Sequence, residues 1–105
     1  MDTRRITDPV VRAAFEAWQK PDLNAWLAHF APGATLLDDG APRDLQAFSR
    51  EIGKERFLGI DRVENHGRDI YGPFHSDTWG DFNTYFKFRL NAQGQIERLE
   101  IGQAG

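Results

Sequence analysis

The spacing of the hydrophobic residues changes once along this chain of 105 residues, close to Gly53. Before Gly53 apolar residues recur every three or four positions, as in amphipathic helices, and after it they alternate with polar residues, as in half-buried strands. Helices followed by strands bury their apolar faces against one another, which defines the α+β class. The sequence therefore predicts a single domain, 1–105, with three N-terminal helices packed on a curved antiparallel sheet.

Capping residues and helix breakers divide the first half of the chain into three helices. Asp8 and Asp22 each stand where a side chain can accept hydrogen bonds from a first helical turn, and the third helix begins at Asp44. We expect helices over residues 9–19, 23–30 and 44–52. Their inward apolar residues are Val11, Ala14, Phe15, Trp18, Leu23, Trp26, Leu27, Phe30, Leu45, Phe48 and Ile52.

Alternating residues and turn signals predict the strands. We expect strands over residues 34–38, 57–65, 69–75, 80–90 and 95–102, and a loop over residues 40–43. In the longest strand Phe82, Phe86 and Phe88 share one face, which the helices must cover. Short turns join the last four strands, and this favours an antiparallel meander.

The composition argues against nucleic acid and membranes as partners. The chain has 13 basic and 16 acidic residues, and the basic residues are scattered among the acidic ones, whereas phosphate binding requires clustered basic residues. No apolar run approaches the roughly 18 residues of a membrane span. The first residues, MDTRRITDP, lack the apolar core of a signal peptide. We therefore expect a cytoplasmic protein.

Metal and nucleophile chemistry find little support in the sequence. The chain has no cysteine, which excludes disulfides and thiolate sites. His29, His66 and His75 share no ligand spacing with one another or with an acid on one element. We expect no bound metal and no cofactor. His75 and Trp79 flank a turn, where they either edge a pocket or are simply exposed.

One segment points to chemistry, the apolar strand that ends in Asp38-Asp39-Gly40. With Leu36 and Leu37 under the helices, Asp38 would lie at the mouth of an apolar interior. Burial there would raise the pKa of its carboxyl and suit it to proton transfer. The alternative is structural, because Asp-Asp-Gly is also a turn signal. The sequence leaves both interpretations open.

The order of elements, with residues 30–35 (FAPGAT) entering a strand that ends in acid, resembles the nuclear transport factor 2-like superfamily. Residues 79–89 and 94–99 look like the last hairpin of that fold. The resemblance covers almost the whole chain. It implies a cystatin-like α+β roll, in which sheet and helices enclose a cone. Members include ketosteroid isomerases and polyketide cyclases.

Similarity to the ketosteroid isomerases implies a general base at Asp38. It also implies two oxyanion donors, which would stand near Ala14 and Thr84, and neither residue is of the required type. Losing one such donor costs on the order of 10²–10³ in rate, so steroid isomerisation is not expected. Asp38 remains the single candidate catalytic residue.

Two function classes remain, and they differ in whether the cone is hollow. The first is a small-molecule-binding protein or an enzyme of undetermined reaction, with Asp38 at the polar end of an apolar pocket for a small apolar or carbonyl-containing ligand. Its candidate ligand-binding residues are Phe15, Trp18, Trp26, Phe48, Thr84 and Phe86. The spacing of Trp18 and Trp26 among Leu and Phe on the helices favours the alternative that the two tryptophans only fill the core.

The second class is a non-catalytic interaction module whose cone is filled by the same aromatic residues. Its convex sheet face, which carries Tyr85, Lys87 and Arg89, would pair with another copy or another protein. Alternating charges and aromatic rings are typical of modest interfaces, and members of the superfamily commonly pair through this surface. We expect a homodimer in either class.

Overall fold

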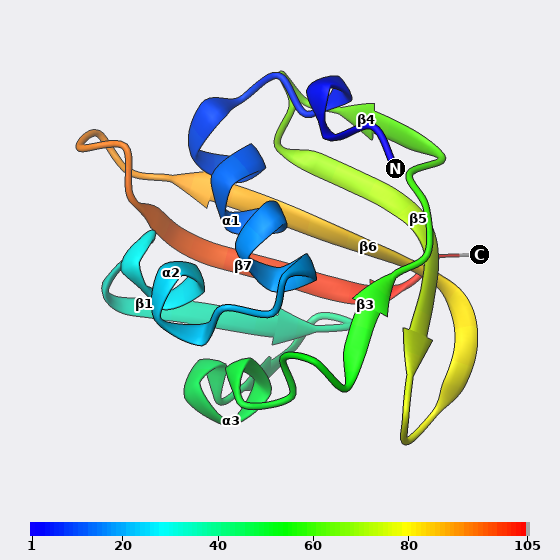
Figure 1. Cartoon of the computed structure of the whole chain (residues 1–105). Helices are drawn as coiled ribbons and strands as arrows, with labels where there is room; N and C mark the ends of the chain where they lie inside the picture. The colour runs from blue at the N-terminus through cyan, green and yellow to red at the C-terminus, as the bar shows by residue number, and fades with distance from the viewer. Residues whose placement is uncertain (105) are drawn as a thin grey trace.

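Three α-helices lie against one face of a curved seven-stranded sheet in the computed structural model, which describes residues 1–104 (Figure 1). The expected α+β class is confirmed. The helices, after a short 3-10 turn η1 (Thr3–Arg5), are α1 (Pro9–Gln19), α2 (Leu23–Ala28) and α3 (Leu45–Ser49). The strands are β1 (Phe30–Asp38), β2 (Ala41–Arg43), β3 (Glu55–Phe57), β4 (Arg62–Glu64), β5 (Asp69–Ser76), β6 (Gly80–Leu90) and β7 (Ile96–Gln103).

The two predicted aspartate caps, Asp8 and Asp22, are confirmed, and Asp44, predicted as the first residue of the third helix, is also a cap. Asp8 Oδ1 accepts hydrogen bonds from the backbone N–H groups of Val10 and Val11, at 2.9 and 3.1 Å. Asp22 and Asp44 cap α2 and α3 in the same way. Each cap satisfies donors that the first helical turn leaves without partners. The second and third helices are nevertheless shorter than predicted, because the chain becomes extended at residue 30 and turns after residue 49.

The expected loop over residues 40–43 is wrong, because these residues form a hairpin with β1. Asp39 and Gly40 have φ values of 49° and 85°, so both central turn residues lie in the left-handed region. Asp-Gly is the preferred pair for such a two-residue turn, whose twist matches the flanking strands. The turn therefore returns the chain along β1, with Leu36 opposite Arg43 and Asp38 opposite Ala41.

The sheet is mixed, since one pair is parallel. Strand β1 runs beside β7 in the same direction, with Asp38 opposite Ile101, while the meander of β5, β6 and β7 is antiparallel as expected. The strand order is β2-β1-β7-β6-β5-β3, and β4 pairs with β5.

The single strand predicted over residues 57–65 is divided into β3 and β4. Between them the chain crosses close over Gly72 of β5, where a Cβ atom would collide with the carbonyl oxygen of Gly59. Leu58 N donates to the carbonyl of Pro73 at 2.7 Å, and Asp61 N to that of Tyr71 at 2.8 Å. This crossing interrupts the regular ladder, so β3 ends before it and β4 begins after it, each with three residues.

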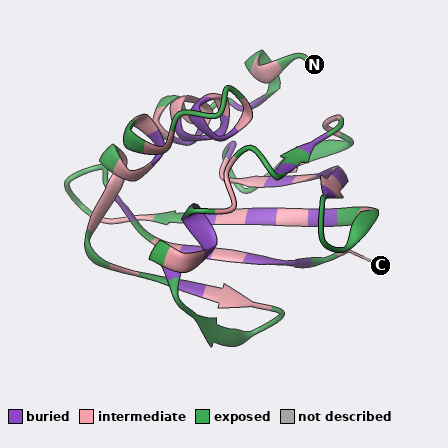
Figure 2. Cartoon of the chain, turned by 60° about the horizontal axis from the view of Figure 1, so that its bottom comes forward, coloured by how far each residue is buried: buried purple, intermediate pink, exposed green. Residues whose placement is uncertain are grey.

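Aromatic rings fill the space between the helices and the sheet. Trp18 stacks on Phe48 with ring centroids 5.0 Å apart, and Trp26 packs on Trp18 at 4.9 Å. Phe86 of β6 contacts both tryptophans from the sheet side. Along the strands, buried positions alternate with less buried ones (Figure 2). The predicted inward face of the longest strand is confirmed.

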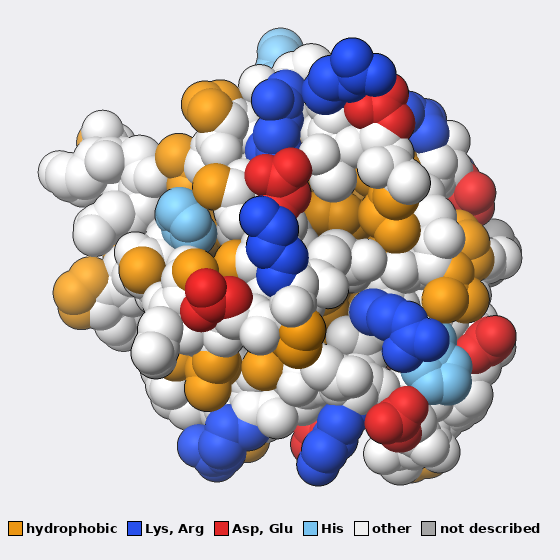
Figure 3. Space-filling view, in the orientation of Figure 1, with side chains coloured by type: hydrophobic (Ala, Val, Ile, Leu, Met, Phe, Trp, Pro, Cys, Tyr) orange, Lys and Arg blue, Asp and Glu red, His pale blue; other side chains and the backbone are white. Residues whose placement is uncertain are grey.

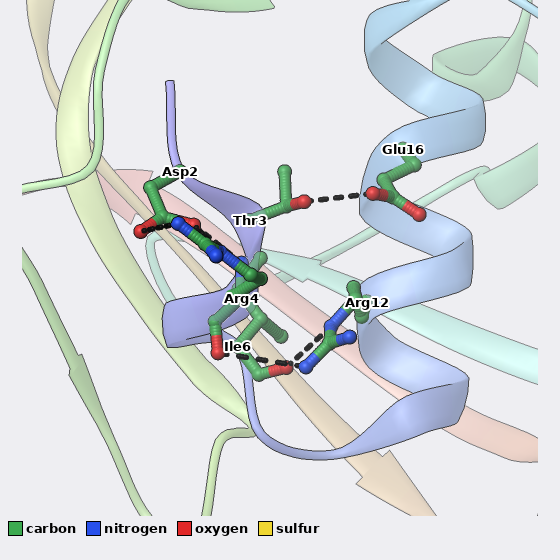
Figure 4. Close-up of polar contacts among 6 residues, drawn as sticks. All are labelled: Asp2, Thr3, Arg4, Ile6, Arg12 and Glu16. Carbon is green, nitrogen blue, oxygen red and sulfur yellow. Dashed lines mark hydrogen bonds and ion pairs between the residues drawn. The ribbon is translucent and has the colours of Figure 1, made fainter.

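The N-terminal turn η1 is fastened to α1 (Figure 4). Thr3 Oγ1 donates to Glu16 Oε2 at 2.7 Å, and Arg12 Nε donates to the carbonyl of Ile6 at 3.0 Å. Ile6 itself is fully buried, so this segment covers one end of the aromatic core.

On the face seen in Figure 3, basic and acidic side chains are mixed with apolar ones. Within residues 1–104, no helix combines the length and apolar character needed to cross a membrane.

Candidate functional site

A pocket of about 420 Å³ opens at one end of the sheet, where several strands end or begin. Strands β1 and β7 end there, β6 and β3 begin there, and the turn between β5 and β6 forms part of the rim. Apolar side chains make up much of the wall: Phe48, Phe74, Trp79, Phe82, Phe86 and Ile101. Polar and charged side chains make up the rest of the wall: Asp38, Asp39, Arg43, Glu55, Asp81, Thr84 and Gln103. A concave wall that combines aromatic side chains with convergent polar groups is a common form of small-molecule site.

Glu55 is the buried carboxyl in this wall. It is the first residue of β3 and is only 8% exposed, and Ser76 Oγ donates a hydrogen bond to its Oε2 at 2.9 Å. Burial raises the pKa of Glu55 above its ordinary value, and the hydrogen bond from Ser76 opposes this effect only in part. Glu55 therefore keeps its proton to higher pH than an exposed glutamate, which suits it to exchange a proton or a hydrogen bond with a ligand.

The sequence interpretation missed Glu55, although a signal was present. The predicted strand began at Phe57, which is buried on the inward face. Alternation by two places Glu55 on the same face as Phe57. Extending the strand backward by one period would have put a carboxyl at the edge of the apolar interior.

Asp38, the predicted catalytic residue, lies in the same pocket wall but in a different setting. Its Oδ2 accepts a hydrogen bond from Arg43 Nη1 at 2.9 Å across the β1–β2 hairpin, and its side chain is 34% exposed. The guanidinium of Arg43 also lies over the ring of Phe48, 5.2 Å from its centroid. The turn is formed by Asp39 and Gly40, so Asp38 is the last strand residue before it. A proton-transfer role for Asp38 stays a prediction.

The six predicted ligand-binding residues fall into two groups. Phe48, Thr84 and Phe86 line the pocket. The other three, Phe15, Trp18 and Trp26, are not in the pocket wall and are at most 1% exposed inside the core. The deep part of the space between helices and sheet is therefore filled, and the open part lies at its rim.

Thr84 has its hydroxyl proton already engaged. Its Oγ1 donates to the carbonyl of Gly102 at 2.6 Å, and the residue is 3% exposed. A hydroxyl oxygen retains acceptor capacity when its proton is donated. Thr84 is thus suited to accept a hydrogen bond from a ligand rather than to donate one.

The rim carries an exposed aromatic side chain. Trp79, at the tip of the β5–β6 turn, is 76% exposed and lines the pocket together with Asp81 and Phe82. Ser76 Oγ accepts hydrogen bonds from the backbone N–H groups of Thr78 and Trp79, at 3.2 and 3.1 Å. The same hydroxyl that donates to Glu55 therefore shapes the turn.

Of residues 1–104, no three His, Asp or Glu side chains form a group that could hold a metal ion.

No protein-family model matches the chain, and no curated protein matches its sequence. Solved structures do match. A nuclear transport factor 2-like protein of unknown function from Cytophaga hutchinsonii superposes with a TM-score of 0.71 at 13% identity, over 99% of this chain and 91% of that one. A putative polyketide cyclase from Sinorhizobium meliloti gives a TM-score of 0.71 at 20% identity, over 96% of this chain and 99% of that one.

A third similar structure is the Orange Carotenoid Protein of Anabaena (Nostoc), binding canthaxanthin. It has a TM-score of 0.67 at 19% identity, and the match covers 90% of this chain but 35% of that one. At these identities the likeness concerns the fold alone. The chain has the nuclear transport factor 2-like fold that its sequence resembled.

Proposed function

We propose that this protein binds a small, largely apolar molecule in the pocket, with Glu55 as the group that recognises its polar atom. The observation that carries the proposal is a buried carboxyl with a raised pKa in the wall of an aromatic pocket. Desolvated titratable groups in clefts are enriched at functional sites. Among the similar folds, a putative polyketide cyclase and a canthaxanthin-binding protein support a ligand-binding or enzymatic role.

The charges around the pocket favour a neutral ligand with a hydrogen-bond acceptor. Its wall holds the carboxyl groups of Asp38, Asp39, Glu55 and Asp81 and the single guanidinium of Arg43, so an anion would meet net repulsion. Protonated Glu55 is a hydrogen-bond donor, and a carbonyl oxygen is a suitable acceptor for it. A carbonyl compound with an apolar body fits both features.

An enzymatic version of the proposal assigns different roles to two carboxyls. Asp38 lies near enough to Glu55 that its negative charge helps to raise the pKa of Glu55. Two carboxyls in unlike environments, one buried and one paired with arginine, can serve as acid and base in one site. In this version Glu55 donates a hydrogen bond to the carbonyl oxygen of the ligand. Asp38 removes a proton from the adjacent carbon after the hydrogen bond between Asp38 and Arg43 breaks.

A direct test uses prodan, a neutral naphthyl ketone whose emission shifts to the blue in apolar surroundings. We expect saturable binding with a blue shift in the native protein. Gln103→Trp places a large ring in the pocket wall at an exposed residue, and we expect it to weaken binding at least about tenfold, which is about 1.4 kcal/mol.

Gln93→Trp is the matched control, because Gln93 is an exposed residue of the β6–β7 turn and does not line the pocket. It adds the same ring without touching the site, so its affinity for prodan should equal that of the native protein. Absence of saturable binding in the native protein would count against the proposed function. Equal weakening by both substitutions would show that prodan binds elsewhere.

A second proposal concerns the outer face of the sheet, the one turned away from the helices (Figure 1). Lys87 Nζ lies 4.9 Å from the ring centroid of Tyr85 and 5.8 Å from that of Tyr71. Aromatic rings beside cations are common in protein interfaces. We propose that two copies pair symmetrically through this face.

Sedimentation should then show a dimer of the native protein at micromolar concentration. Tyr85→Asp places a charge at the centre of the face twice in a symmetric dimer, and we expect it to weaken pairing at least about tenfold. Gln93→Glu adds a negative charge at an exposed turn and should leave the dimer unchanged. A native protein that sediments as a monomer would contradict this proposal.

A further inference from the structure

The turn between β5 and β6 is held by a histidine that lies between two carboxylates. His75 Nδ1 is 2.7 Å from Asp81 Oδ1, and His75 Nε2 is 2.8 Å from Asp77 Oδ1. An ionised carboxylate only accepts hydrogen bonds, so both ring nitrogens must donate to satisfy this geometry. Only the protonated imidazolium has two N–H groups. The arrangement therefore matches the charged form of His75.

The two contacts tie the ends of the turn together. Asp81 belongs to β6, whereas Asp77 lies within the turn that carries Trp79. Asp81 and Trp79 both line the pocket, while Asp77 does not. The backbone N–H of Asp77 also donates to the carbonyl of Lys54, at 2.9 Å, which attaches the turn to the segment before β3. His75 thus contacts both a strand residue and a turn residue at the pocket rim.

We propose that His75 is a positioning residue for the pocket rim. In its protonated form it holds Asp81 and the turn bearing Trp79 in the pocket wall, and ligand affinity falls when His75 loses its proton. This inference rests on the proposed ligand-binding function and adds a regulation of the same site. The neutral ring would keep one donated hydrogen bond and turn a lone pair toward the other carboxylate, which would free one end of the turn.

The charges around His75 oppose one another. Asp81 and Asp77 raise the pKa of His75, while the charge of Arg56 on β3, directly opposite His75 in the strand register, lowers it. The net effect is a raised pKa, so His75 keeps its proton, and with it both hydrogen bonds, to higher pH than an ordinary histidine does. Because solvent screens these partly exposed groups, we expect loss of the His75 proton to weaken ligand binding only roughly twofold to fivefold.

The test follows the His75 ring by NMR and prodan affinity over the same range, from about pH 5 to about pH 9. All proteins compared in this experiment carry Glu55→Gln, so that titration of Glu55 does not contribute to the pH dependence. Asp77→Asn replaces a residue outside the pocket and deletes one charge while keeping an oxygen that accepts a hydrogen bond. We expect it to lower the pKa of His75 and to move the midpoint of prodan affinity down by the same amount. Asp61→Asn, at an exposed residue, is the matched control and should move neither midpoint.

Two results would overturn the inference while leaving the proposed function intact. One is prodan binding with no dependence on pH in the titration range of His75. The other is an affinity midpoint that stays in place when Asp77→Asn moves the NMR midpoint. If the native protein fails to bind prodan at any pH, the proposed function fails instead. In that case the NMR signal of the Trp79 backbone amide still tests whether His75 positions the rim. That role is refuted if the signal does not titrate with His75.

Discussion

Replacing Trp26 with alanine is expected to cost about 3–5 kcal/mol of the free energy of unfolding. The side chain is fully buried, packs on Trp18 and Phe30 with ring centroids 4.9 Å away in each case, and donates from Nε1 to Ser49 Oγ at 3.0 Å. Truncation would leave a cavity among rings and a buried hydroxyl without its partner. Because small domains are stable by only about 5–15 kcal/mol, much of the total would be lost. Urea denaturation followed by circular dichroism measures it.

Trp79→Ala is the matched control, since it makes the same substitution at a tryptophan that is 76% exposed. Its effect on unfolding should stay within about 0.5 kcal/mol, as for surface substitutions in general. Similar losses for the two variants would contradict the aromatic core. The contrast also separates the two tryptophans by role, because Trp79→Ala removes a pocket residue and is expected to weaken prodan binding instead.

The local elements of this fold could be predicted because their signals are local. A helix cap needs one aspartate and the turn that follows it, and Asp8 and Asp22 were identified correctly. The inward face of 80–90 needs only alternation along one strand. The errors arose for elements whose structure depends on which strands pair with one another. The hairpin of β1 and β2 depends on two left-handed residues, and the parallel pairing of β1 with β7 joins segments far apart in the chain.

The candidate site was predicted only in part for the same reason. Asp38, Phe48, Thr84 and Phe86 were expected near a pocket and line it. Arg43 was expected in a loop, and its position beside Asp38 follows from the hairpin that the sequence interpretation missed.

The sequence left open whether the cone is hollow or filled. In the structure its deep part is filled and its rim is open. Trp18 and Trp26 close the deep interior, which favours stability. The rim keeps an open pocket with Glu55 in its wall. One small domain can therefore have a packed core and still keep an open pocket at its rim, which is where the proposed ligand would bind.

Glu55→Gln is expected to stabilise the protein at neutral and alkaline pH. A carboxyl whose pKa is raised by folding contributes stability that is fully present below its unfolded pKa, near 4.5, and is lost as the pH rises through its folded pKa. Above that range the native protein holds a buried charge that glutamine lacks. The variant should therefore be more stable than the native protein above that range, by an amount set by how far folding raises the pKa of Glu55. Thermal unfolding at a series of pH values measures the gain, with about 4–8 °C in Tm per kcal/mol.

The pH dependence of this gain identifies its cause. The Tm difference between Glu55→Gln and the native protein should be small near pH 4.5 and grow as the pH rises, because only the native side chain titrates. Glu97→Gln, at an exposed glutamate, should show no such growth. The amide of the variant still donates a hydrogen bond at alkaline pH. Prodan binding by the variant should therefore fall there only by the roughly twofold to fivefold expected from His75, and by less than that of the native protein. Parallel Tm curves for the native protein and Glu55→Gln would show that Glu55 is not desolvated. The case for Glu55 as the recognising group would then fall.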